Sequence, residues 1–174
     1  MIKISEGIYT GNQSDCFHPE ENSDWFVVHA CKFPCHRDAV GYNKSPDKQS
    51  PFYLYKEAEG NLYLNMIDPP VPLFDKEMFR IAILEMSGNW AKGKNILIHC
   101  NQGESRSPTL AMLLLRKIEE IPYDEYFNVV EYFKENFFPA YAPGKGLETY
   151  LKENLKVLIK EAMSYAEDEN SDSI

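Results

Sequence analysis

Hydrophobic and polar positions in the N-terminal third of the chain alternate over short segments, which is typical of strands and turns. Trp25–Ala30 is apolar almost throughout and predicts a buried strand. Phe52–Tyr55 and Leu62–Met66 predict two further strands, with a hairpin turn at Glu59-Gly60-Asn61 between them. The polar segment Lys32–Ser50 contains two prolines and a glycine, so it predicts a long loop.

The period becomes helical after a cluster of prolines at 69–72. Apolar residues recur at helical spacing over 79–90, 110–118, 126–137 and 147–158, and Asp75 is a predicted N-cap for the first of these helices. The short apolar run Ile96–Ile98 is typical of a central parallel strand. Strands followed by helices predict an α/β fold, with a mostly parallel twisted sheet of about four to five strands flanked by helices.

The length of the chain predicts a single domain, and its net charge argues against one class of partner. The 174 residues suffice for one domain, which we expect over residues 1–165, and the acidic segment 166–174 predicts a disordered tail. With 18 basic and 27 acidic side chains the net charge is −9, which argues against a nucleic-acid partner.

Neither membrane insertion nor secretion is predicted. The longest apolar run, Leu110–Leu115, is far shorter than the ~20 residues that span a bilayer. The first residues lack a basic segment followed by an apolar one, so no signal peptide is expected. Four cysteines are too few for a disulfide scaffold in a chain of this length. We therefore expect a cytoplasmic monomer.

The segment 96–109 carries the clearest chemistry. A buried strand ends at His99, a glycine-containing loop follows, and a helix begins near Arg106 with Pro108 in its first turn. Backbone N–H groups of such a loop converge on an anion, and the helix dipole adds positive charge. A thiol at Cys100, beside these groups and a guanidinium, should ionise below its ordinary pKa. Thiolate, N–H groups and guanidinium together suit attack on a phosphoryl group.

This segment resembles the signature of the cysteine-dependent protein phosphatases, His-Cys-x5-Arg-Ser/Thr. The finer pattern is similar to the dual-specificity branch of the protein tyrosine phosphatase superfamily. The residues that carry the resemblance are His99, Cys100, Gly103, Ser105, Arg106 and Ser107.

The resemblance implies a role for each residue of the loop. Cys100 attacks phosphorus and forms a thiophosphate, and Ser107 hydrogen-bonds the thiolate when it leaves. His99 supports the loop from below. The oxygens of the phosphoryl group are held by the loop itself, namely Asn101, Gln102, Gly103, Glu104, Ser105 and Arg106.

The resemblance also implies a general-acid aspartate about thirty residues before the cysteine. Asp68 lies 32 residues upstream (100 − 68), just after a predicted strand and before two prolines. It would protonate the leaving oxygen and then activate water. Asp75 is the alternative, but its position favours a helix cap.

The function implied is hydrolysis of phosphotyrosine, and of phosphoserine or phosphothreonine, in a phosphorylated protein substrate. The chemistry needs neither a metal nor another cofactor. Three alternatives stay open. The same chemistry would act on a phosphoinositide, a nucleotide or an RNA 5′-phosphate; the domain would bind phosphorylated motifs without catalysis; or the cysteine would belong to a sulfurtransferase-type site.

A second cysteine-rich segment, His29–His36, contains two histidines and two cysteines. Structural zinc sites usually pair two ligand turns separated by a longer span, so this spacing does not predict a metal site. In some members of the resembled family, a second cysteine at the end of a neighbouring strand forms a reversible disulfide with the nucleophile. Cys31, and after it Cys35, are the candidates for such pairing with Cys100.

Overall fold

The fold is built on one sheet whose strand order is β1-β2-β6-β3-β5-β4. The computed structural model describes residues 1–20 and 23–171, with side chains up to residue 164. Six strands are found in this part of the chain, where we expected four to five. They are β1 (Ile2–Ser5), β2 (Ile8–Gly11), β3 (Trp25–His29), β4 (Tyr55–Ala58), β5 (Asn61–Leu64) and β6 (Asn95–His99).

The two strands outside the segments predicted above are β1 and β2, which pair antiparallel with each other. Of the two, β1 forms the edge of the sheet. It is short and half exposed, so its hydrophobic pattern is weak, and Gly7 makes the turn into β2 with a φ of 69°. The strands β2, β6, β3 and β5 are mutually parallel, and β4 closes the other edge as the antiparallel partner of β5. The predicted parallel sheet is therefore confirmed for its centre, while both of its edges are antiparallel.

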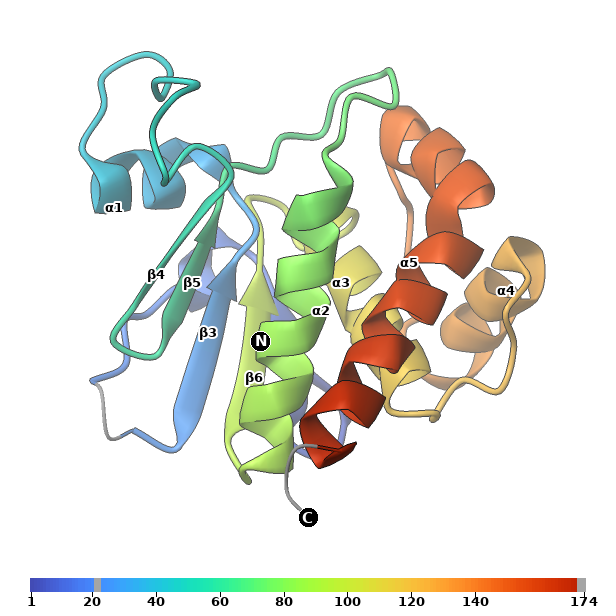
Figure 1. Cartoon of the computed structure of the whole chain (residues 1–174). Coiled ribbons are helices and arrows are strands. Elements are labelled where there is room, and N and C mark those ends of the chain that lie inside the picture. Colours follow the sequence, from blue (N-terminus) through green and yellow to red (C-terminus); the bar gives the residue numbers. More distant parts are fainter. Residues whose placement is uncertain (21–22, 172–174) are drawn as a thin grey trace.

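Four helices cover one face of the sheet: α2 (Lys76–Ala91), α3 (Arg106–Lys117), α4 (Tyr126–Asn136) and α5 (Lys145–Ser171). Helices α2 and α3 lie directly on the central strands, α5 packs across both, and α4 packs on α3 and α5 (Figure 1). The main core lies between these helices and the sheet. None of the helices in the described residues is both long and apolar enough to cross a membrane.

Two predicted irregular segments contain helix instead. The first part of the expected Lys32–Ser50 loop forms the short element η2 (Lys32–His36), which is extended at Phe33 and helical after it. It continues into α1 (Arg37–Val40), which ends at Gly41. Prolines and polar residues in this segment favoured the prediction of a loop. The helix can still form, because Pro34 lies in its first turn, where proline is tolerated. Helix α5 reaches Ser171, well into the tail that we expected to be disordered, since neither glycine nor proline interrupts its good helix formers after Gly146. Residues 172–174 of that tail lie outside the described residues.

The four parallel strands end in register at one edge of the sheet. His99 is paired with Gly11 on one side and with His29 on the other, and His29 is paired with Tyr63. The loops that follow these strands therefore start side by side. Because loops at the carboxyl ends of parallel strands form the usual binding site of α/β sheets, this edge is where a site is expected.

Candidate active site

The loop between β6 and α3 has the predicted strand–loop–helix form. Residues 100–105 connect His99 to the first residue of α3, Arg106. Gly103 has a φ of 82°, and a β-carbon there would lie 3.1 Å from the carbonyl oxygen of Gly11. A side chain at position 103 would therefore meet both backbone strain and the end of β2. The glycine lets the loop curl back over Cys100.

Cys100 is buried at the start of this loop, and two donors point at its sulfur. The backbone N–H of Gly103 lies 3.2 Å from Sγ. The hydroxyl of Ser107 lies 3.3 Å from Sγ and 3.1 Å from the carbonyl oxygen of Gly11, so these two acceptors share its proton. Burial opposes ionisation, but the hydrogen bonds from Ser107 and Gly103 and the charge of Arg106 outweigh it and lower the pKa of the Cys100 thiol below its ordinary value of 9.0.

Arg106 is held rigidly at the other end of the loop. Its Nη1 donates to the backbone oxygens of Ala30 and Met66, both at 3.1 Å, and its Nη2 donates to Oδ1 of Asn101 at 2.7 Å. Its Nε is buried and has no hydrogen-bond partner among the described residues. A buried guanidinium N–H is costly to leave unpaired, so this donor suits an anion bound in the loop.

The remaining loop residues are anchored mainly through their backbone. The carbonyl of Asn101 accepts from Gln13, that of Glu104 accepts from Ala142, and Oγ of Ser105 accepts from the N–H of Gly144. The side chains of Gln102 and Glu104 are exposed. The predicted phosphate-binding residues thus form one continuous loop that two neighbouring segments hold in place.

Asp68 lies on the long connection after β5, over the segment that precedes α5. A β-carbon on Gly144 would lie 2.7 Å from Cγ of Asp68, so the carboxylate rests against the Gly144 backbone. Since Gly144 also donates to Ser105, the structure brings Asp68 to the rim of the loop. The Asp68 carboxylate is exposed and makes no hydrogen bond with the part of the chain that the structure describes, which leaves it available for proton exchange.

Asp75 has the structural role predicted for it. It is the N-cap of α2, and its Oδ1 accepts a hydrogen bond of 2.8 Å from the N–H of Glu77. This geometry satisfies one of the free N–H groups at the helix start. Of the two candidate acids, therefore, only Asp68 lies beside the segment that holds the loop of residues 100–105.

His99 and the two candidate redox cysteines lie behind the loop. The His99 side chain contacts His29 and Cys35, and among the described residues it makes no hydrogen bond with the loop itself. Cys31 is buried just after β3 and donates to Oε1 of Gln13. No thiol is within hydrogen-bonding distance of Cys100 in the described residues, and the disulfide with Cys31 or Cys35 remains a prediction.

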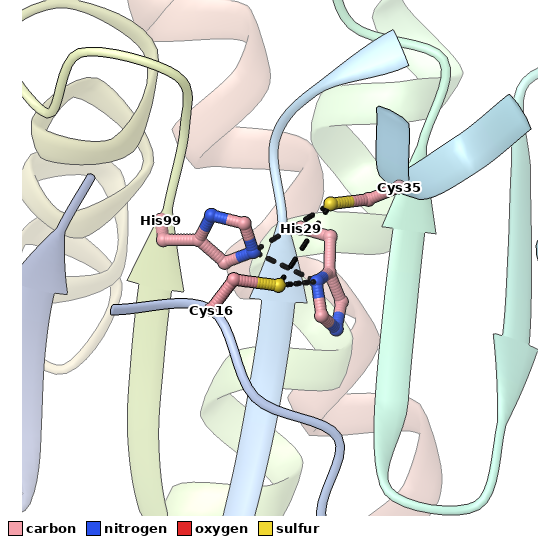
Figure 2. A group of neighbouring side chains, drawn as sticks. All are labelled: Cys16, His29, Cys35 and His99. Carbon is pink, nitrogen blue, oxygen red and sulfur yellow. Dashed lines mark hydrogen bonds between the residues drawn. The ribbon is translucent and has the colours of Figure 1, made fainter. Parts of the chain in front are cut away.

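One group of side chains escaped the sequence prediction. Cys35, His29 and His99 meet a fourth side chain, that of Cys16, on the face of the sheet opposite the helices (Figure 2). The signal for the two histidines was present, because β3 (WFVVH) and β6 (NILIH) both end in histidine. Cys16, on an irregular segment, offered no such signal.

No protein-family model matches the chain, and no curated protein matches it in sequence. Solved structures do match. DUSP15 is 20% identical, with a TM-score of 0.63 over 97% of this chain and 95% of that one. A variant of human DUSP28 is 15% identical, with a TM-score of 0.60 over 92% and 97%. The human tyrosine phosphatase-like serine/threonine/tyrosine-interacting protein is 18% identical, with a TM-score of 0.53 over 94% and 93%. The chain therefore has the fold of the dual-specificity phosphatases.

Proposed function

We propose that the chain is a phosphomonoester hydrolase in which Cys100 is the nucleophile. The observation that carries the proposal is the arrangement around one sulfur: two donors hold Cys100 Sγ within a loop that Arg106 closes, and a buried N–H of that guanidinium has no partner in the described residues. Thiolate, N–H groups and guanidinium are the groups that transfer of a phosphoryl group to sulfur requires.

In the first step the Cys100 thiolate attacks phosphorus, and a sulfur–phosphorus bond forms as the bond to the leaving oxygen breaks. Arg106 and the N–H groups of the loop stabilise the charge on the other three oxygens. The protonated carboxyl of Asp68 gives its proton to the leaving oxygen, so that an alcohol or phenol departs.

In the second step water attacks phosphorus and gives a proton to the Asp68 carboxylate. The sulfur–phosphorus bond breaks, and inorganic phosphate leaves. Cys100 returns as a thiolate, which the Ser107 hydroxyl stabilises by its hydrogen bond. The net reaction consumes one water for each phosphomonoester.

The substrate that we favour is phosphotyrosine in a protein. Exposed apolar side chains lie on the two loops that flank the catalytic loop, namely Phe33, Ile67, Val71 and Leu73. Such a surface suits the aromatic ring and neighbouring side chains of a phosphopeptide. The exposed Glu104 on the catalytic loop disfavours substrates with many phosphates, such as phosphoinositides.

The test is hydrolysis of an aryl phosphate and a phosphotyrosine peptide by the wild type and three variants. Cys100→Ser should abolish turnover, and Arg106→Lys should lower kcat/KM by at least about 10²-fold because the planar fork is lost. Lys134→Ala, a change at an exposed side chain of α4, should leave it unchanged. Unchanged turnover in Cys100→Ser would disprove the proposal. Tungstate binding without any turnover would identify a phosphate-binding module instead.

A panel of substrates then tests the substrate class. A phosphotyrosine peptide should give a higher kcat/KM than an inositol phosphate or a nucleotide. A preference for either of the latter would retain the chemistry and reject the protein substrate.

A further inference from the structure

Four potential metal ligands from four separate parts of the chain meet behind the catalytic loop (Figure 2). His29 and His99 are register partners at the ends of the parallel strands β3 and β6, so their side chains point to the same face of the sheet. Cys16 follows the short helix η1 (Gln13–Asp15), and Cys35 lies in η2. The ligand atoms of all four lie within 4.8 Å of one another.

The separations between these atoms fit a tetrahedral zinc site. With zinc–sulfur bonds of about 2.3 Å and zinc–nitrogen bonds of about 2.0 Å, neighbouring ligand atoms are about 3.8 Å apart for two sulfurs, about 3.5 Å for sulfur and nitrogen and about 3.3 Å for two nitrogens. The two sulfurs are 3.9 Å apart. The sulfur–nitrogen separations are 3.6 Å for Cys16 to His29 and 4.0 Å for Cys35 to His99.

Of these separations, the one between the two histidines is shorter than the tetrahedral geometry requires. Nδ1 of His29 and Nε2 of His99 are 2.7 Å apart and share a hydrogen bond. They would move apart by about 0.6 Å around zinc. A shift of this size is within the range of side-chain rotation.

A hydrogen bond to Asn61 decides which ring nitrogen of His29 carries the proton, and leaves the lone pair of Nδ1 facing the cluster. Its Nε2 lies 2.9 Å from Oδ1 of the buried Asn61. The orientation of that amide is fixed, because its Nδ2 donates to the backbone oxygens of Glu59 and Pro19. Oδ1 therefore accepts and His29 carries its proton on Nε2. The unprotonated Nδ1 faces the cluster, where it accepts from Nε2 of His99 and offers the lone pair that would bind a metal. Metal-bound histidines are oriented in this way by a hydrogen bond from their other nitrogen.

The neighbouring histidine and cysteine are excluded from the ligand set by their own contacts. Both nitrogens of His36 are used, by the Tyr42 hydroxyl and the Phe52 carbonyl. The thiol of Cys31 lies beside Cys35 and donates to Oε1 of Gln13, and its sulfur is not among the four ligand atoms that lie within 4.8 Å of one another. The sequence spacing within His29–His36 does not bring these four side chains together, because Cys16 and His99 lie elsewhere in the chain.

We propose that Cys16, His29, Cys35 and His99 bind one structural zinc ion. Two thiolates and two imidazoles in a tetrahedral arrangement favour zinc over harder cations, and four protein ligands leave no open position for catalysis. His29, Cys35 and His99 are buried, while Cys16 is partly exposed and provides the route by which the ion reaches the site.

The position of the site would allow bound zinc to stabilise the conformation of the catalytic loop. His99 directly precedes Cys100, and because side chains alternate along a strand, the two point to opposite faces of the sheet. Zinc would tie together the segments after β2, at the end of β3 and at the end of β6, together with η2. These segments include Gln13 and Phe33, whose backbone contacts Asn101 in the loop.

The test is metal content after expression with zinc and purification without a chelator or a metal-affinity tag. The wild type should contain about one zinc per chain by mass spectrometry of the elements. Cys16→Ser and Cys35→Ser should each lose most of it. Cys31→Ser, the same change at a buried thiol outside the ligand group, should retain it. In cobalt-substituted protein the strong visible absorption of tetrahedral thiolate-bound cobalt should appear in the wild type and in Cys31→Ser only.

Zinc content can be measured independently of phosphatase activity, so the two proposals can fail separately. Cys100→Ser should bind zinc as the wild type does, whatever its activity. Folded wild-type protein with four reduced thiols and no zinc would overturn the proposal, as would a disulfide between Cys16 and Cys35 in its place. Loss of zinc in Cys31→Ser with retention in Cys35→Ser would overturn this ligand set.

Discussion

The carboxylate of Asp68 rests on the backbone of Gly144, although the two residues are far apart in the sequence. A β-carbon at Gly144 would lie 2.7 Å from Cγ of Asp68, well inside van der Waals contact. Gly146 contacts the same connection in the same way, since its β-carbon would lie 2.7 Å from the carbonyl carbon of Val71. The chain around Gly144 and Gly146 therefore fixes the position of Asp68, the candidate general acid.

Gly144→Ala should displace Asp68 from the rim of the catalytic loop. We expect kcat for an alkyl phosphate, whose leaving group needs a proton, to fall about 10²-fold, while kcat for an aryl phosphate with an acidic phenol changes little. Steady-state kinetics on both substrates measure this difference.

Gly88→Ala is the matched control, because nothing lies within 4 Å of a β-carbon at that position in α2. It should leave both rates unchanged. An equal loss on both substrates in Gly144→Ala would show that the glycine supports the loop rather than Asp68.

Asp68→Asn and Asp75→Ala should separate the acid from the helix cap. Asp68→Asn should lower kcat for the alkyl phosphate by about 10²- to 10⁴-fold without changing stability. Asp75→Ala should retain kcat and lower the free energy of unfolding by about 0.5–2 kcal/mol, measured by urea denaturation, because the N–H of Glu77 loses its partner. The reverse assignment of effects would make Asp75 the acid.

The strand–loop–helix form of residues 95–117 could be predicted from the sequence because these residues are contiguous. Cys100, Gly103, Arg106 and Ser107 lie on one strand–loop–helix unit, and the strand and helix periods on either side mark its ends. The hairpin turn at Glu59 and Gly60 was confirmed for the same reason. The strand before it was placed wrongly, since β4 covers Tyr55–Ala58 and shares only Tyr55 with the predicted Phe52–Tyr55. Local patterns predict local structure.

Contacts between distant segments could not be predicted in this way. The support of Asp68 by Gly144 and the group around Cys16 depend on how loops pack at the end of the sheet. Polar residues and prolines in 32–50 predicted a loop where η2 and α1 form, because tertiary contacts of Cys35 and His36 decide that segment rather than helix propensity.

Ser107→Ala should raise the pKa of the Cys100 thiol. The wild-type pKa lies below the ordinary value because hydrogen bonds to the thiolate outweigh burial, and Ser107 is the largest of the favourable contributions. The rate of alkylation by iodoacetamide follows the thiolate fraction, so its midpoint should lie below pH 9.0 in the wild type and move to higher pH in the variant. An unchanged midpoint would mean that the Ser107 hydroxyl does not stabilise the thiolate.

Asn61→Ala should weaken zinc binding without removing a ligand. The amide fixes the proton of His29 on Nε2, and loss of such a partner typically costs 10- to 100-fold in metal affinity, on the order seen for other metal-bound histidines. Competition with a chromogenic chelator measures the affinity. Asn65→Ala is the control, since it removes an amide that donates to the Tyr53 carbonyl outside the cluster. Equal weakening in both variants would contradict the assigned role of Asn61.

The most direct test of the central claim is to trap the covalent intermediate. Asp68→Asn, mixed rapidly with an aryl phosphate, should accumulate one phosphoryl group per chain, because the base for the second step is missing. Mass spectrometry of its peptides should place that group on Cys100, and the double variant with Cys100→Ser should carry none. A phosphoryl group on any other residue, or turnover in the absence of Cys100, would contradict the account.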